Sequence, residues 1–117
     1  MDFSGQMAII TGAARGVGRA TAHLLAQRGA KVALIDVDYE KLESVRSEIE
    51  EYTKDVLIYK CDVSDEKRVN EVMADIIEKY GRADILVQKP EQKKYMISLM
   101  RTVISFMCCF LQLTVIM

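Results

Sequence analysis

The chain has 117 residues, half of them hydrophobic and 28% charged, with a formal net charge of −1. This balance is typical of one globular domain and excludes disordered, fibrous and strongly basic nucleic-acid-binding chains. Three cysteines, two of them adjacent, and a single histidine without a nearby ligand-type partner favour neither a disulfide framework nor a metal site. No basic region followed by an apolar run opens the chain, so we expect no secretory signal and a cytoplasmic location.

The first strand and helix are predicted from the change in apolar spacing near the N-terminus. Met7 to Thr11 is a short apolar run between glycines, which is typical of a buried strand. From Gly16 to Arg28 apolar residues recur at helical spacing, and Gly29 then ends the predicted helix. The predicted apolar stripe of this helix consists of Val17, Ala20, Leu24 and Leu25, with Thr21 between them.

Two further pairs of strand and helix follow. Strands are predicted over Lys31 to Asp36 and over Asp55 to Cys61, and the helices after them have Asp38 and Ser64 as predicted N-caps. The buried face of each helix is predicted from 3.6-residue periodicity. These faces consist of Leu42, Val45, Ile49 and Tyr52 in the first helix, and of Val69, Val72, Met73, Ile76, Ile77 and Tyr80 in the second.

The alternation of strands and helices predicts the fold class. After Gly81 ends the third helix, Ala83 to Val87 begins a fourth strand. Strands separated by helices of this length imply an α/β fold, in which a parallel sheet with right-handed crossovers has helices on its faces.

A glycine-rich loop joins the first strand to the first helix. Thr11 to Gly18 reads T-G-A-A-R-G-V-G, and its place between a strand and a helix is the context of a phosphate-binding loop. Gly12 permits a tight turn, Gly16 lets the backbone approach a pyrophosphate, and Gly18 lets the helix pack closely on the strand. The N–H groups and dipole at the helix start favour an anion there. The alternative is a glycine-rich turn that binds no ligand.

This T-G-x-x-x-G-x-G spacing resembles the glycine motif of the short-chain dehydrogenases/reductases, and most of all the branch that contains the 3-oxoacyl-carrier-protein reductases. Three further segments are similar to the family: Leu34 to Asp36, Cys61-Asp62-Val63, and Gly81 to Val87. The resemblance implies that residues 1–87 form a dinucleotide-binding half-domain with a Rossmann-type fold, truncated to about the first four strands.

The resemblance also implies a nicotinamide dinucleotide as cofactor. Asp36 lies 18 residues after Gly18, near the distance at which an acid hydrogen-bonds the ribose 2′-hydroxyl of NAD and repels the 2′-phosphate of NADP. Arg15 resembles the basic residue that meets this phosphate in NADP-binding members. We favour NAD, because an arginine in the loop need not oppose it, and NADP is the alternative. Both side chains could instead be merely solvated charges.

The remaining cofactor contacts are implied by the resemblance alone. Asp62 and Val63 would hold the edge and face of the adenine, unless Asp62 is only a turn residue before Ser64. The complete set of candidate cofactor-binding residues is Gly12, Ala14, Arg15, Gly16, Val17, Gly18, Asp36, Val37, Asp62 and Val63.

No catalytic residue is predicted in this chain. The family's acid/base tyrosine precedes a lysine by four residues, and none of the five tyrosines here does. Val87 is followed by Gln88-Lys89-Pro90-Glu91, where the family continues with N-N-A-G. The chain therefore resembles an NAD(P)-dependent oxidoreductase of alcohol or carbonyl substrates that is truncated before its catalytic residues and at best binds cofactor. The alternative is a non-enzymatic nucleotide-binding or membrane-associated fragment, for example a partner for other subunits.

Residues 88–117 differ in character from the preceding half-domain. A polar linker extends from Gln88 to Lys94, and the tail from Tyr95 is almost entirely apolar. This tail could cover the open edge of the sheet, or it could be an aggregation-prone segment. It could also insert into a membrane, although the uncharged run from Thr102 to Met117 is short for a spanning helix. We favour a fourth interpretation, an out-of-frame, read-through or spliced-in sequence.

Overall fold

The structure is a computed structural model that describes residues 3–81, 83–88 and 113–116. Within these ranges helices and strands alternate along the first 88 residues, and a further strand lies near the C-terminus. The elements are β1 (Met7–Thr11), α1 (Gly16–Gln27), β2 (Lys31–Asp36), α2 (Tyr39–Ile49), β3 (Val56–Lys60), α3 (Glu66–Tyr80), β4 (Ile85–Gln88) and β5 (Leu113–Ile116).

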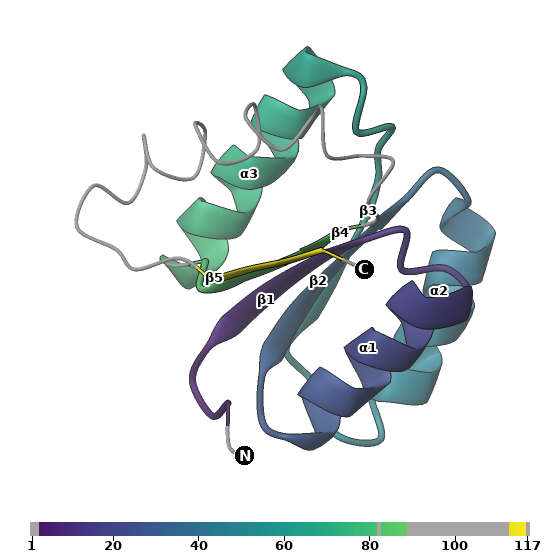
Figure 1. Cartoon of the computed structure of the whole chain (residues 1–117), viewed down its shortest axis with the longest axis vertical. Coiled ribbons are helices and arrows are strands. Elements are labelled where there is room, and N and C mark those ends of the chain that lie inside the picture. The colour runs from purple at the N-terminus through teal and green to yellow at the C-terminus, as the bar shows by residue number, and fades with distance from the viewer. Residues whose placement is uncertain (1–2, 82, 89–112, 117) are drawn as a thin grey trace.

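The strands form a parallel sheet in the order β3-β2-β1-β4-β5. Figure 1 shows α1 and α2 on one face of this sheet and α3 on the other. The crossover through α1 leads from β1 to the adjacent strand β2, and the crossover through α3 leads from β3 to β4, on the other side of β1. The predicted α/β fold with a parallel sheet and flanking helices is confirmed.

The central strand β1 is buried along its whole length, which explains its continuous apolar sequence. Its side chains alternate between the two layers. Ala8 and Ile10 join the core beneath α1 and α2, whereas Met7 and Ile9 join the core beneath α3. The predicted bounds of β1 and β2 agree with the structure to the residue.

The predicted apolar stripe of α1 is wrong at most of its positions. Val17 is 64% exposed and Leu24 is 47% exposed. The buried side of the helix consists of Gly18, Ala22, Leu25 and Ala26. Leu25 is thus buried as predicted. At Gly18 only glycine fits, because the helix approaches the loop after β1 very closely, and a pattern of large apolar residues does not reveal this position.

Helix α2 begins as predicted, since the Asp38 carboxylate accepts a hydrogen bond of 3.2 Å from the Lys41 N–H. It ends earlier than its apolar periodicity suggested. The helix stops at Ile49, so Tyr52 lies beyond it and is 43% exposed. Tyr52 therefore does not belong to the buried face of α2.

Helix α3 is capped by Asp65, so the predicted cap at Ser64 is wrong. The Asp65 carboxylate accepts from the Arg68 N–H at 3.2 Å, while Ser64 donates to the carboxylate of Asp62. An aspartate one residue later along the chain provides the cap, because Ser64 is already held in the preceding turn. Gly81 ends α3 in a left-handed conformation, as predicted.

Strand β5 belongs to the segment that the sequence separates from the half-domain. It pairs in parallel with β4, and Thr114 lies opposite Leu86. Figure 1 shows it beside β4 at the edge of the sheet. These four residues thus cover the edge of β4, while residues 89–112, on which the other interpretations of the tail chiefly depend, lie outside the described residues. No helix in the described ranges is long and apolar enough to cross a membrane.

Candidate functional site

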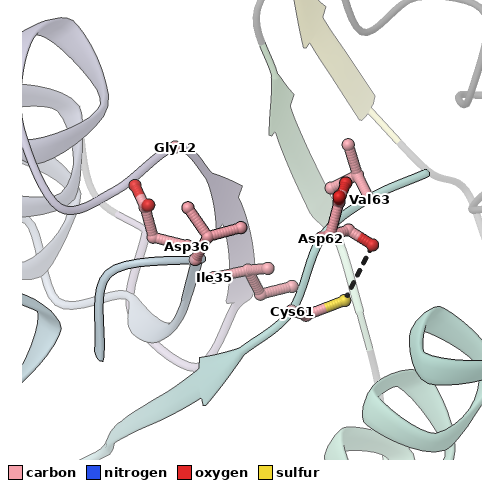
Figure 2. Close-up of a pocket in the computed structure, with 7 residues that line it drawn as sticks. Gly12, Ile35, Asp36, Cys61, Asp62 and Val63 are labelled. Atoms are coloured by element: carbon pink, nitrogen blue, oxygen red, sulfur yellow. Dashed lines mark hydrogen bonds between the residues drawn. The ribbon is translucent and has the colours of Figure 1, made fainter. Parts of the chain in front are cut away.

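A small pocket of about 200 Å³ opens where the carboxyl ends of β1, β2 and β3 meet. Five residues singled out from the sequence line it, together with two that were not. The lining residues are Gly12, Ile35, Asp36, Val37, Cys61, Asp62 and Val63. Figure 2 shows Asp36 beside the loop at Gly12, across the pocket from Asp62 and Val63. The topology thus brings together three of the separate motifs that resemble the family.

The glycine loop has the conformation that its spacing indicates. Gly12 and Gly16 have φ values of +64° and +62°, in the left-handed region that favours glycine. A Cβ on Gly18 would lie 2.2 Å from the Gly12 carbonyl oxygen, so only glycine lets α1 begin this close to β1. A Cβ on Gly16 would meet nothing within 4 Å. Open space beside the Gly16 backbone is what an approaching ligand would need.

Within the described part of the chain, no capping side chain accepts a hydrogen bond from the N–H groups at the N-terminus of α1. Arg15 is at the N-cap position, and the first turn contains no acidic residue. The first N–H groups of a helix have no partners within the helix, and they carry the positive end of its dipole. This end of α1 is therefore suited to an anion. It lies at the end of the glycine loop, whose first glycine, Gly12, lines the pocket.

The Asp36 carboxylate is held in place by two backbone N–H groups. Its Oδ2 accepts from Ala14 at 3.1 Å and its Oδ1 accepts from Asp38 at 3.2 Å. Each carboxylate oxygen has two lone pairs, so both can still accept from a hydroxyl group. Asp36 thus ties the end of β2 to the glycine loop and presents an oriented carboxylate to the pocket.

Arg15 does not bond to Asp36. Its Nη2 donates to Asp38 Oδ2 at 3.2 Å, and the Arg15 side chain is 62% exposed. In the sequence analysis, Asp36 favoured NAD and Arg15 favoured NADP. The structure adds a second acid, Asp38, as the direct partner of the arginine.

Asp62 forms the turn after β3. Its Oδ1 accepts from the Ser64 N–H at 3.0 Å and from the Ser64 hydroxyl at 2.8 Å. These hydrogen bonds hold the pKa of the Asp62 carboxyl below its usual range. Asp62 therefore has the turn role that the sequence left open, and it also lines the pocket beside Val63.

Cys61 and Ile35 line the pocket but were not among the predicted cofactor-binding residues. Cys61 is buried and its thiol donates to the Asp62 carbonyl oxygen at 3.5 Å, the dashed line in Figure 2. Burial raises the pKa of this thiol, which keeps it neutral. The available signal was its position directly before Asp62, at the end of a strand next to β2. No cluster of three potential metal ligands occurs in the part of the chain that the structure describes.

Three other residues of the predicted cofactor-binding set differ from one another in exposure to solvent. Ala14 is buried and offers only its N–H to Asp36. Val17 and Val37 are both well over half exposed, and Val37 also lines the pocket. Exposed apolar side chains at the mouth of a pocket are suited to contact with the apolar face of a ring.

Comparison with known proteins identifies the family. Residues 6–90 match the model of the family described as short chain dehydrogenase. The chain belongs to the short-chain dehydrogenase family. It is 41% identical over 87 residues to the 3-oxoacyl-[acyl-carrier-protein] reductase FabG of Thermotoga maritima, a match that covers 74% of this chain and 35% of the reductase. The chain thus spans about a third of the length of this curated relative.

Solved short-chain dehydrogenase structures have the same fold. A metagenomic short-chain oxidoreductase in complex with NADP superposes with a TM-score of 0.78 and 30% identity, over 89% of this chain and 57% of that one. A short-chain dehydrogenase/reductase from Burkholderia phymatum in complex with NAD has a TM-score of 0.71 and 31% identity, over 76% of this chain and 32% of that one. The predicted resemblance to the family and its Rossmann-type fold is confirmed, and the cofactor of such relatives is a nicotinamide dinucleotide.

Proposed function

We propose that this chain binds NAD through its adenosine and pyrophosphate groups and prefers it to NADP. The observation that carries the proposal is the Asp36 carboxylate, which the Ala14 N–H holds beside Gly12 at the pocket. A carboxylate in this position accepts hydrogen bonds from the ribose hydroxyls and repels a 2′-phosphate at short range.

The pyrophosphate would lie at the N-terminus of α1. The open space at Gly16 accommodates it, and N–H groups of the first helical turn, including those of Val17 and Gly18, would donate to its oxygens. Val63 and Val37 would contact the adenine, which fits their position on the pocket rim. The bound nicotinamide would supply the capacity to accept or donate a hydride.

We propose that the reaction of the whole protein is the NAD(P)-dependent oxidation of an alcohol or reduction of a carbonyl. No tyrosine of the 117 residues precedes a lysine by four positions. The ordinary pKa of a tyrosine, about 10, makes it a poor proton shuttle at neutral pH. Burial raises the pKa of Tyr59 and Tyr80 above this ordinary value. We therefore propose that this chain by itself binds cofactor without turnover, so that binding rather than catalysis is the property to measure.

Calorimetric titration of the full chain with NAD and NADP tests the proposal. We expect weak binding, with NAD tighter than NADP, and we expect Asp36→Ala to reduce that preference. Gly16→Val should abolish binding, because its side chain fills the space that the pyrophosphate needs.

Gly81→Val is the matched control for Gly16→Val. Gly81 has a φ of +72° with nothing within 4 Å of an added Cβ, so the backbone strain is similar, but it lies at the end of α3. Equal binding by the two folded valine variants would overturn the proposed pyrophosphate site. Tighter binding of NADP than NAD by the unmodified chain would overturn the preference.

A further inference from the structure

Asp38 forms three hydrogen bonds at the end of β2. One carboxylate oxygen accepts from Arg15 Nη2 at 3.2 Å, and the other accepts from the Lys41 N–H at 3.2 Å. Its own N–H donates to Asp36 Oδ1. Asp38 thus caps α2, positions Asp36 and pairs with the loop arginine at the same time.

The surface beside this pair is a shallow groove of mixed charge. It is lined by Arg15, Val37, Asp38, Tyr39, Glu40, Glu43 and Lys60. Lys60 is the register partner of Asp36 on the neighbouring strand. Two cations therefore lie near the end of β2, where the proposed NAD site would place the ribose 2′-position, and Asp38 is bonded to one of them.

We propose that Asp38 determines cofactor specificity by neutralising Arg15. This inference rests on the proposed binding of NAD. A 2′-phosphate that sought Arg15 would have to displace the Asp38 carboxylate from the guanidinium and would then be repelled by it. Asp38 is a positioning residue in this role, since it acts through Arg15 and not through contact with NAD.

The capping role of Asp38 must be separated from its charge. Serine is as good an N-cap as aspartate, so Asp38→Ser keeps the cap and removes the charge. Asp38→Glu keeps the charge and is the matched control. If Asp38 were only a structural cap, the serine variant would leave cofactor discrimination unchanged.

The test uses the full chain and two probes that differ only at the 2′-position, adenosine 5′-monophosphate and adenosine 2′,5′-bisphosphate. We expect Asp38→Ser to increase the affinity for the bisphosphate relative to the monophosphate by about three- to tenfold, as suits a partly exposed charge pair. Asp38→Glu should leave this ratio within about twofold of the unmodified chain, because the charge is retained. Circular dichroism verifies that α2 is intact in both variants.

Arg15→Gln provides an independent measurement on an exposed side chain that does not endanger the fold. In the unmodified chain it should leave the bisphosphate-to-monophosphate ratio within about twofold, because Arg15 is already neutralised. In the Asp38→Ser background it should remove most of the gain.

Two outcomes would overturn the inference while the proposed function stands. One is binding of NAD and the monophosphate with no change in the ratio on Asp38→Ser, and the other is a severalfold loss of bisphosphate affinity on Arg15→Gln alone. If the unmodified chain binds neither NAD nor the monophosphate, the proposed function fails and this inference fails with it.

Discussion

The N-termini of α1 and α3 differ, although both helices follow strands of the same sheet. Asp65 caps α3 with a hydrogen bond to the Arg68 N–H, and Glu66 adds an acid in the first turn. Helix α2 begins in the same way, with an aspartate cap and a glutamate in its first turn. Helix α1 has neither feature. It follows Gly12 and begins at Gly16, and both glycines have positive φ.

We interpret this difference as one between a helix start that is capped by its own chain and one that, in our proposal, binds a ligand. A capping carboxylate satisfies N–H groups and complements the helix dipole from within the protein. At α1 a carboxylate would compete with a pyrophosphate for the same N–H groups and repel it. The lack of a side-chain cap at α1 therefore supports the proposed binding of a pyrophosphate there.

The largest effect is expected from closing the space between α1 and the loop. Gly18→Ala would place a Cβ 2.2 Å from the Gly12 carbonyl oxygen, a backbone atom that cannot rotate away. We expect a loss of about 3 kcal/mol in the free energy of unfolding, measured by urea denaturation. Gly16→Ala, where only backbone strain is added, should cost about 1 kcal/mol. If Gly18→Ala were no less stable than Gly16→Ala, the close approach of α1 to the loop would be contradicted.

A smaller effect is expected from removing the cap of α3. Asp65→Ala should lower the free energy of unfolding by about 1 kcal/mol, because the Arg68 N–H loses its acceptor. NAD affinity should not change, since α3 lies on the other face of the sheet from α1. Asp65→Ser retains a cap and is the control. A loss of NAD affinity as large as that of Gly16→Val would break the distinction between the two helix starts.

The smallest effect concerns a carboxylate that reaches α1 from α2, beyond the first turn. Glu48 accepts hydrogen bonds from Arg19 Nε at 3.0 Å and from His23 Nε2 at 2.8 Å. The Arg19 bond first, and the His23 bond second, hold the pKa of the Glu48 carboxyl below its ordinary value of 4.5.

The sign of the pH dependence follows from this lowered pKa. The unfolded chain takes up the Glu48 proton first as pH falls, so the stabilisation is present above about pH 4.5 and is lost below it. Glu48→Gln should therefore lose less stability than the unmodified chain between pH 7 and pH 3. The difference should be under about 1 kcal/mol because the side chains are partly exposed. Equal losses in urea melts of both proteins would show that the Glu48 cluster contributes nothing.

Some elements were predictable from sequence because one physical requirement dominates them. β1 and the central residues of β2 are buried on both faces, so each strand contains an apolar run with clear ends. The Asp38 cap was predictable because the aspartate directly precedes a helical pattern. The glycine loop was predictable because its conformation and close packing require glycine at fixed spacing.

Other features depend on contacts between distant segments. The start of the buried side of α1 is set by the close contact of Gly18 with the loop, which leaves the larger Val17 and Leu24 exposed. The pairing of Arg15 with Asp38 depends on where the glycine loop meets the start of α2. β5 pairs with β4, although residues 89–112 separate the two strands in the sequence. The apolar sequence around β5 lacks turn signals that would fix the register of this pairing.

The most direct test of a ligand site at the N-terminus of α1 is nuclear magnetic resonance of the isotope-labelled chain during titration with NAD. We expect the backbone N–H signals of Gly16, Val17 and Gly18 to shift progressively and to saturate. The Arg68 N–H signal at the capped start of α3 should remain unchanged, because Asp65 already occupies it. Saturating shifts at α3 with none at the start of α1 would contradict the proposal that the uncapped helix binds the cofactor.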